Sequence, residues 1–131
     1  MPMSRNMEAV LAAYRAFTDG DLHRFVGSLA ADFVSRQSAA VPWRGTYRGH
    51  DGVREMFAKV AERAEAIYEP SEFIEGEDRV VVLGDARIVP RSTGEPATVR
   101  ELHVWGVDSG RLTSLDVFLN APRELLAALG A

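Results

Sequence analysis

The chain has 131 residues, no cysteine and a formal net charge of −4, with 15 basic against 19 acidic residues. This length predicts one domain over residues 1–131, and the absence of cysteine excludes disulfides and cysteine-ligated metals. No basic run reaches five residues and no apolar run approaches about 18 residues, so neither nucleic acid nor a membrane is an expected partner. The N-terminus lacks a secretory signal pattern, which predicts a soluble cytoplasmic protein.

Apolar residues recur at helical spacing in the first half of the chain. The elements expected there are helices at Arg5–Thr18 and from Leu22 to about Ala31, a strand at Phe33–Ser38, a loop at Ser38–Gly52 and a helix beginning at Val53. Asp21 is suited to cap the second helix, and His50 or Asp51 the third.

Strand periodicity replaces helical periodicity after Ile67. The expected elements are strands at Ile67–Glu75 and Arg79–Val89, a loop at Pro90–Pro96, a hairpin at Ala97–Asn120 and a helix at Pro122–Leu129. Pro70 has no N–H for a ladder, so its strand is predicted to be bent or at a sheet edge. The hairpin turns at Asp108-Ser109-Gly110, where glycine supplies the positive φ of a short loop.

Helices that precede a run of antiparallel strands predict an α+β domain. We expect the sheet to curl around the helices and to leave a conical cavity between them. Alternate residues of the first hairpin strand share one face, which we interpret as a wall of that cavity: Val99, Glu101, His103, Trp105 and Val107. Histidine changes charge near neutral pH, which makes His103 a candidate for chemistry.

Short motifs follow one another at characteristic spacing along nearly the whole chain. They are Tyr14, Asp19-Gly20-Asp21-Leu22, Ala31-Asp32, Gly45-Thr46-Tyr47-Arg48-Gly49, Gly52-Val53-Arg54-Glu55-Met56-Phe57, Asp78-Arg79-Val80-Val81-Val82, and His103-Val104-Trp105 through Gly110-Arg111. In this order they resemble the SnoaL-like branch of the nuclear transport factor 2-like superfamily, which also contains ketosteroid isomerase, scytalone dehydratase and limonene epoxide hydrolase. The resemblance implies a cone-shaped, curled mixed or antiparallel sheet around N-terminal helices.

The resemblance also implies roles for particular residues. Tyr14 matches the oxyanion-donating tyrosine of ketosteroid isomerase, and His103 falls at that enzyme's second donor and at a pocket histidine of SnoaL-like cyclases. The isomerase's aspartate base corresponds to Ser38, and the cyclases' catalytic aspartate corresponds to Val117. Neither position carries a base here, and the neighbouring Asp116 points to the opposite face of its strand.

We therefore predict that Tyr14 and His103 polarise a ligand oxygen, with Glu101 or Asp85 as the base. Alignment with the family implies that four residues of the Arg79–Val89 strand face the cavity: Val81, Leu83, Asp85 and Arg87. Periodicity instead favours an outer, solvated face or a salt-bridged dimer interface for this set, because the other face of the strand is apolar. The residues predicted to contact a ligand are Trp43, Met56, Leu83, Arg87, Trp105, Leu115, Val117 and Leu119. Trp43 is expected either to cover the pocket or to anchor its loop.

No metal is expected, because the three histidines lack metal-ligand spacing, and no nucleotide cofactor, because phosphate-binding motifs are missing. The resemblance implies a homodimer through the open sheet face, to which Val104, Phe118 and Leu112 would contribute. Three functions remain open. They are a cofactor-free isomerase, cyclase or dehydratase acting on a hydrophobic carbonyl or polyketide-like compound, a ligand-binding dimer without turnover, and a structural dimerisation module.

Overall fold

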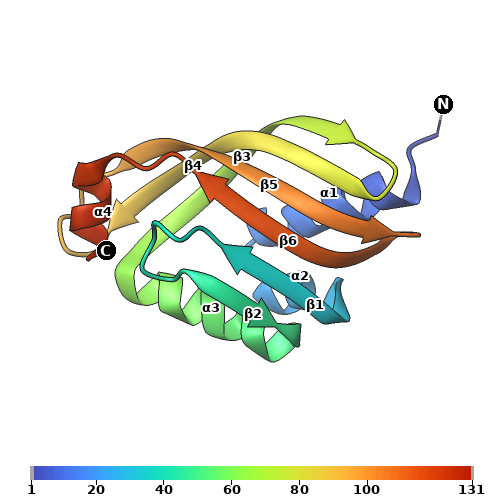
Figure 1. Cartoon of the computed structure of the whole chain (residues 1–131), viewed down its shortest axis with the longest axis horizontal. Helices are drawn as coiled ribbons and strands as arrows, with labels where there is room; N and C mark the ends of the chain where they lie inside the picture. Colours follow the sequence, from blue (N-terminus) through green and yellow to red (C-terminus); the bar gives the residue numbers. More distant parts are fainter. Residues whose placement is uncertain (1, 131) are drawn as a thin grey trace.

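A curled six-stranded sheet and a layer of helices make up the computed structural model, which describes residues 2–130 (Figure 1). The elements are α1 (Arg5–Thr18), α2 (Leu22–Gly27), β1 (Leu29–Gln37), β2 (Gly45–Arg48), α3 (Gly49–Arg63), β3 (Ala64–Glu75), β4 (Arg79–Pro90), β5 (Ala97–Asp108), β6 (Arg111–Leu119) and α4 (Arg123–Leu129). The strand order is β2-β1-β6-β5-β4-β3, and only the β1–β6 pair is parallel within the described chain. This confirms the predicted α+β fold.

Local capping and amphipathic patterning explain the first two helices. The Ser4 side chain accepts a hydrogen bond from the Met7 N–H at the start of α1, and Asp21 accepts one from the Arg24 N–H at the start of α2, as predicted. The buried face of α1 includes Val10, Ala13, Tyr14 and Ala16. The core lies between this helical layer and the inner face of the sheet. No helix of residues 2–130 has the length and apolarity needed to cross a membrane.

Three boundaries in the first half differ from the prediction. Helix α2 ends at Gly27 rather than near Ala31, because Leu29 already pairs with Leu112 of β6. Strand β2 lies inside the predicted loop, where four residues pair with the end of β1. Helix α3 begins at Gly49 without a side-chain cap, and His50 donates from Nε2 to the Leu29 carbonyl oxygen, 2.8 Å away. In each case pairing with a distant segment overrides the local pattern.

The strand predictions hold more closely. Strand β3 is an edge strand, as Pro70 predicted, and a register shift lies between Pro70 and Glu72. The β5–β6 hairpin closes through Ser109 and Gly110, whose φ angles are 51° and 81°. Two positive φ angles are the geometry of a type I′ turn, which matches the twist of the flanking strands.

The two faces of β4 are occupied as periodicity predicted, and the expectation from family alignment is wrong. Residues Val80, Val82, Gly84, Ala86 and Ile88 are buried on the inner face. Leu83, Asp85 and Arg87 lie on the outer face, because the apolar set of the strand packs against the helices. Asp85 is half exposed there and forms a 3.3 Å ion pair with Arg100 of β5.

Leu112 also differs from the prediction, because it is fully buried rather than on the open face of the sheet. The β5–β6 register runs from Gly106↔Ser114 directly to Val107↔Leu112, so Thr113 is an extra residue in β6. An extra residue reverses the alternation of a strand. Leu112 therefore points inward, although Phe118 on the same strand is 57% exposed.

Candidate functional site

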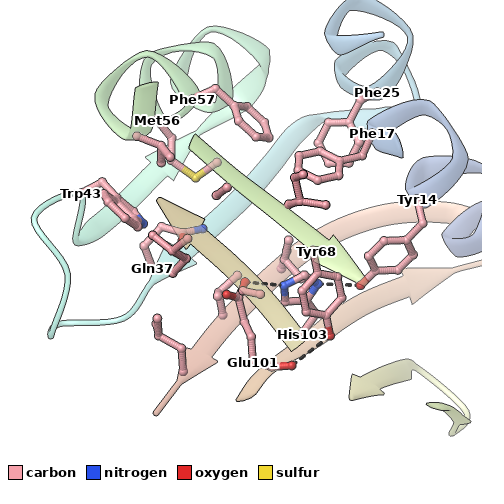
Figure 2. A pocket seen from close by; sticks show the side chains of 18 of the residues that line it. Tyr14, Phe17, Phe25, Gln37, Trp43, Met56, Phe57, Tyr68, Glu101 and His103 are labelled. Atoms are coloured by element: carbon pink, nitrogen blue, oxygen red, sulfur yellow. Dashed lines mark hydrogen bonds and ion pairs between the residues drawn. The ribbon is translucent and has the colours of Figure 1, made fainter. Parts of the chain in front are cut away.

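A pocket of about 120 Å³ lies between the inner face of the sheet and the helices (Figure 2). Most of its lining side chains are apolar, and several are aromatic. The lining residues are Tyr14, Phe17, Phe25, Gln37, Trp43, Met56, Phe57, Val60, Ala66, Ile67, Tyr68, Ala86, Ile88, Glu101, His103, Trp105, Leu115, Val117 and Leu119. These surroundings favour a hydrophobic ligand, with polar contacts restricted to a few groups.

A chain of hydrogen bonds crosses one wall of the pocket. The Trp105 Nε1–H donates to the Tyr14 hydroxyl oxygen over 2.9 Å, and that oxygen lies 2.6 Å from Nδ1 of His103. On the other side of the imidazole, Nε2 lies 2.8 Å from Oε1 of Glu101. Trp105 can only donate, and Nδ1 of a neutral His103 is the acceptor within reach of the Tyr14 hydroxyl among residues 2–130, so Tyr14 donates to Nδ1. His103 therefore carries its proton on Nε2 and donates it to the Glu101 carboxylate.

The pleat of β5 places three members of this chain on one face. Residues Glu101, His103 and Trp105 alternate along the strand, so their side chains all point inward, as the sequence predicted. Tyr14 reaches them from the buried side of α1. Its ring lies nearly parallel to the imidazole of His103, at 4°, and edge-on to the indole of Trp105, at 82°. The four side chains thus form one packed, hydrogen-bonded unit.

Tyr68 of β3 holds the imidazole from the other direction. Its ring stacks on His103, with centroids 3.9 Å apart and planes 25° apart, and its hydroxyl donates to the main-chain oxygen of Glu101 over 2.9 Å. Gly84 makes room for this arrangement, because a Cβ at that position would lie 2.6 Å from the Tyr68 hydroxyl. The position of Tyr68 against His103 therefore depends on a glycine in mid-strand.

Burial controls the protonation of both tyrosines. Desolvation raises the pKa of Tyr14 above its ordinary value of 10.0, although the hydrogen bond from Trp105 acts in the opposite direction. Desolvation also raises the pKa of Tyr68, and the nearby Glu101 carboxylate adds to the effect. Both hydroxyl groups therefore stay protonated and act as donors throughout the neutral range.

The geometry differs from the predicted pair of donors on one ligand oxygen. Tyr14 and His103 do lie close together, but they are bonded to each other. The Tyr14 hydroxyl proton and the His103 Nε2–H are both directed at protein acceptors. The carboxylate of Glu101 retains oxygen lone pairs beyond the one that His103 uses, and its side chain is 16% exposed. Among the four hydrogen-bonded side chains, Glu101 is thus the one that can form a hydrogen bond with a ligand.

The other predicted residues divide into two groups. Trp43, Met56, Trp105, Leu115, Val117 and Leu119 line the pocket. Asp85, Leu83 and Arg87 do not, because they lie on the outer face of β4. Asp85 therefore cannot act as the base inside this pocket. Among residues 2–130, no group of three or more His, Cys, Asp or Glu side chains is arranged to hold a metal ion.

Two polar lining residues were missed by sequence reasoning. Gln37 lies at the end of β1, and its amide nitrogen donates to Ser35 Oγ over 2.9 Å. Tyr68 had one indirect signal, namely Gly84, since a glycine inside a strand marks a close approach of another group. The aromatic lining residues Phe17, Phe25 and Phe57 share the helical spacing of core residues, so the sequence did not distinguish them from the core.

Comparison with known proteins shows a family and several close structures. Residues 10–115 match the family model for a SnoaL-like domain. An NTF2-like protein of unknown function from Burkholderia pseudomallei K96243 is 32% identical, with a TM-score of 0.88 over 98% of this chain and 100% of that chain. TerC, co-crystallized with polyporic acid, is 28% identical, with a TM-score of 0.86 over 98% of this chain and 100% of that chain.

A more distant structure shares the fold alone. It is a protein from Xanthomonas campestris pv. campestris, provisionally named a polyketide cyclase, which is 16% identical with a TM-score of 0.79 over 95% of this chain and 96% of that chain. No curated protein matches the chain. The family match covers most of the sequence, and the NTF2-like structure aligns over nearly all of it. The chain therefore belongs to the SnoaL-like domain family and has the NTF2-like fold.

Proposed function

We propose that this protein is a cofactor-free enzyme in which the Glu101 carboxylate moves a proton on a hydrophobic carbonyl compound. One observation carries the proposal. A buried hydrogen-bond chain from Trp105 through Tyr14 and His103 ends on Glu101, which is the carboxylate that lines the pocket in the described chain. An ordered carboxylate beside an apolar pocket is suited to general acid–base catalysis.

In the proposed reaction, Glu101 removes a proton from the carbon next to the ligand carbonyl. The C–H electron pair moves into the carbonyl system and forms an enolate, while Glu101 becomes a carboxylic acid. Return of this proton to a different carbon completes an isomerisation. Cyclisation or dehydration would begin from the same enolate. His103 orients the Glu101 carboxylate through its Nε2–H, and Tyr14 holds the imidazole in the required tautomer.

The relatives support the class of ligand. TerC was crystallised with polyporic acid, and a structure with the same fold carries the name polyketide cyclase. The aromatic and aliphatic walls of the pocket suit a ring of such a compound.

A ligand-binding protein without turnover is the second candidate. The specific observation in its favour is that Tyr14 and His103 direct their protons at protein acceptors rather than into the pocket. The resemblance also implies that Ser38 and Val117 stand where ketosteroid isomerase and the SnoaL-like cyclases carry their catalytic aspartates. Both candidates use the same pocket and differ in whether Glu101 exchanges a proton with the ligand.

Deuterium exchange distinguishes the two candidates. A thermal-shift screen with polyporic acid, polycyclic ketones and aromatic polyketides would first identify binders. NMR in D₂O would then follow exchange at the carbon next to the carbonyl of each binder. We expect the protein to accelerate exchange and Glu101→Gln to reduce the rate by about 100-fold or more, because an amide cannot accept the proton. Glu77→Gln, in the exposed β3–β4 turn, is the matched control.

Binding without accelerated exchange in the wild-type protein would contradict the enzymatic proposal and favour the binding module. Equal exchange rates for wild type and Glu101→Gln would also contradict it, since another group would then be the base. The control variant tests whether loss of any one negative charge is enough to change the rate.

We also propose that the protein forms a homodimer through the outer face of the sheet. Apolar side chains gather there on four adjacent strands: Ile74, Val81, Leu83, Leu102, Val104 and Phe118. Ile74 and Phe118 are 51% and 57% exposed. Ion pairs border the patch, between Arg36 and Asp116 and between Arg100 and Asp85. An apolar centre with charges of both signs at its edges is suited to pair with a second copy of itself about a two-fold axis.

A further inference from the structure

The volume of the pocket limits the size of the ligand. It measures about 120 Å³. An enclosed apolar cavity of roughly 150 Å³ binds benzene in an engineered protein, so the space here holds about one six-membered ring, and its substituents would extend into the open side of the pocket. The stacked rings of Tyr68 and His103 form one wall, and a flat ring would pack well against such a surface.

The charges around the pocket limit the charge of the ligand. No lysine or arginine is among the described lining residues, and Glu101 is the carboxylate among them. Apolar walls screen a charge poorly, so an anionic ligand would be repelled by Glu101 without a cation to compensate. The pocket therefore favours a neutral compound.

Two groups remain to fix the orientation of a ligand. One is the Glu101 carboxylate, which can accept a further hydrogen bond. The other is the indole N–H of Trp43, which has no hydrogen-bond partner among residues 2–130, although the residue is only 7% exposed. Every fully buried side-chain nitrogen or oxygen in residues 2–130 has a hydrogen-bond partner. Because the Trp43 nitrogen has none, it is not fully buried and a ligand can reach it. Figure 2 shows it turned toward Gln37, another lining residue.

From these observations we infer that the pocket takes a neutral, single-ring compound with a hydroxyl group and a carbonyl group. The hydroxyl donates to one oxygen of the Glu101 carboxylate and the carbonyl oxygen accepts from the Trp43 N–H, in a pose that leaves the carbon next to the carbonyl beside the same carboxylate. The inference rests on the proposed function, because it concerns the same pocket and the same carboxylate, and it narrows the substrate to hydroxylated cyclic or aromatic ketones.

Calorimetric titration with matched ligands tests the inference. The probes are 3- and 4-hydroxyacetophenone, acetophenone, phenol and 4-hydroxybenzoate. We expect one hydroxyacetophenone isomer to bind most tightly, with the isomer set by the spacing of the two polar groups. Loss of either the hydroxyl or the carbonyl should weaken binding about tenfold, the effect of one good hydrogen bond. The anionic benzoate should bind least.

Two variants assign the contacts. Glu101→Gln should bind 4-hydroxybenzoate more tightly than the wild type does, because the repelling charge is gone. Trp43→Phe keeps an aromatic ring but lacks the N–H that binds the carbonyl. In this variant the hydroxyacetophenone should bind no more tightly than phenol, but it should still bind more tightly than acetophenone. Glu77→Gln is the control for charge. The thermal midpoint of each variant without ligand shows whether the fold is intact.

The outcomes separate this inference from the proposed function. Tighter binding of a polycyclic ketone than of any single-ring probe would overturn the inference, even if deuterium exchange still depends on Glu101. Equal affinity for acetophenone and the hydroxyacetophenones in the wild-type protein would also overturn it. The expected ligand pattern without deuterium exchange would support the inference and contradict the enzymatic proposal.

Discussion

At the scale of single residues, the direction of one hydrogen bond determines what the site can do. Tyr14 accepts a hydrogen bond from Trp105 and directs its own proton to Nδ1 of a neutral His103, the acceptor within reach. His103 is only 7% exposed, and both of its nitrogens are occupied. In the proposed mechanism it positions Glu101, and replacing it would leave buried polar partners unpaired. Each such group costs about 1–3 kcal/mol of stability.

The buried tyrosine makes a prediction about alkaline pH. Desolvation raises the pKa of Tyr14 in the folded state above the ordinary value of 10.0 that holds in the unfolded chain. Below pH 10 both states are protonated and the stability is fully present. Above pH 10 the unfolded state loses this proton first, so stability should fall with rising pH, by up to about 1.4 kcal/mol per pH unit for this group.

Urea unfolding between pH 8 and pH 11 measures this effect. Tyr14→Phe should show a smaller loss of stability above pH 10, because the ionising hydroxyl is absent. A residual slope is expected from Tyr68, whose pKa burial also raises. An unchanged slope in Tyr14→Phe would show that the hydroxyl ionises equally in both states.

At the scale of elements, contact between β3 and β4 decides the position of the imidazole. Tyr68 of β3 stacks on His103, and it occupies space that Gly84 of β4 leaves open. The main-chain oxygen of Glu69 also lies against Gly84, so the two strands approach each other closely at this point. The register shift beside Pro70 lies at the same position. The edge strand β3 thus holds the His103 imidazole in place through Tyr68.

Gly84→Ala tests this arrangement. The added methyl group would overlap Tyr68 and the β3 main chain, and we expect a loss of about 1–3 kcal/mol in the free energy of unfolding. Gly27→Ala is the matched control, because nothing lies within 4 Å of a Cβ there and its φ is ordinary. Urea denaturation of both variants gives the comparison. Equal stability of the two variants would mean that β3 moves aside at little cost.

At the scale of the whole molecule, the two faces of the sheet serve different purposes. The inner face carries the core and the pocket, and the outer face carries the apolar patch with its bordering ion pairs. Asp85 and Arg87 belong to the outer face, so they are candidates for the dimer interface and not for chemistry. Loss of the dimer would therefore leave the lining of the pocket intact.

The proposed dimer can be tested by placing a charge within its interface. Phe118→Lys should shift the protein from dimer to monomer in sedimentation experiments at micromolar concentration, because each copy would bring an unpaired lysine into an apolar contact surface. Leu22→Lys is the control, since Leu22 is an exposed apolar residue on α2 and lies away from the sheet. A wild-type monomer under these conditions would contradict the dimer outright.

Much of the fold was predictable because the spacing of apolar residues along a short segment reflects the helix or strand that the segment forms. Helical spacing placed α1, and alternation placed β4, β5 and β6 with their buried faces. Strand β2 was missed because its four residues carry no alternation and form a strand only by pairing with β1. The inward turn of Leu112 was missed for a related reason, since the extra residue at Thr113 is visible only in the register with β5.

The sequence by itself determined the α+β class, the family and the inward face of β5 with Glu101, His103 and Trp105. These follow from periodicity and motif order, which neighbouring residues encode. The tertiary structure alone decided that Tyr14 bonds to His103, that Tyr68 stacks on the same ring, and that Asp85 is excluded from the pocket. Tyr14 and His103 are 89 residues apart in the chain. Their hydrogen bond depends on how a helix packs on a distant strand, and no local pattern specifies that distance.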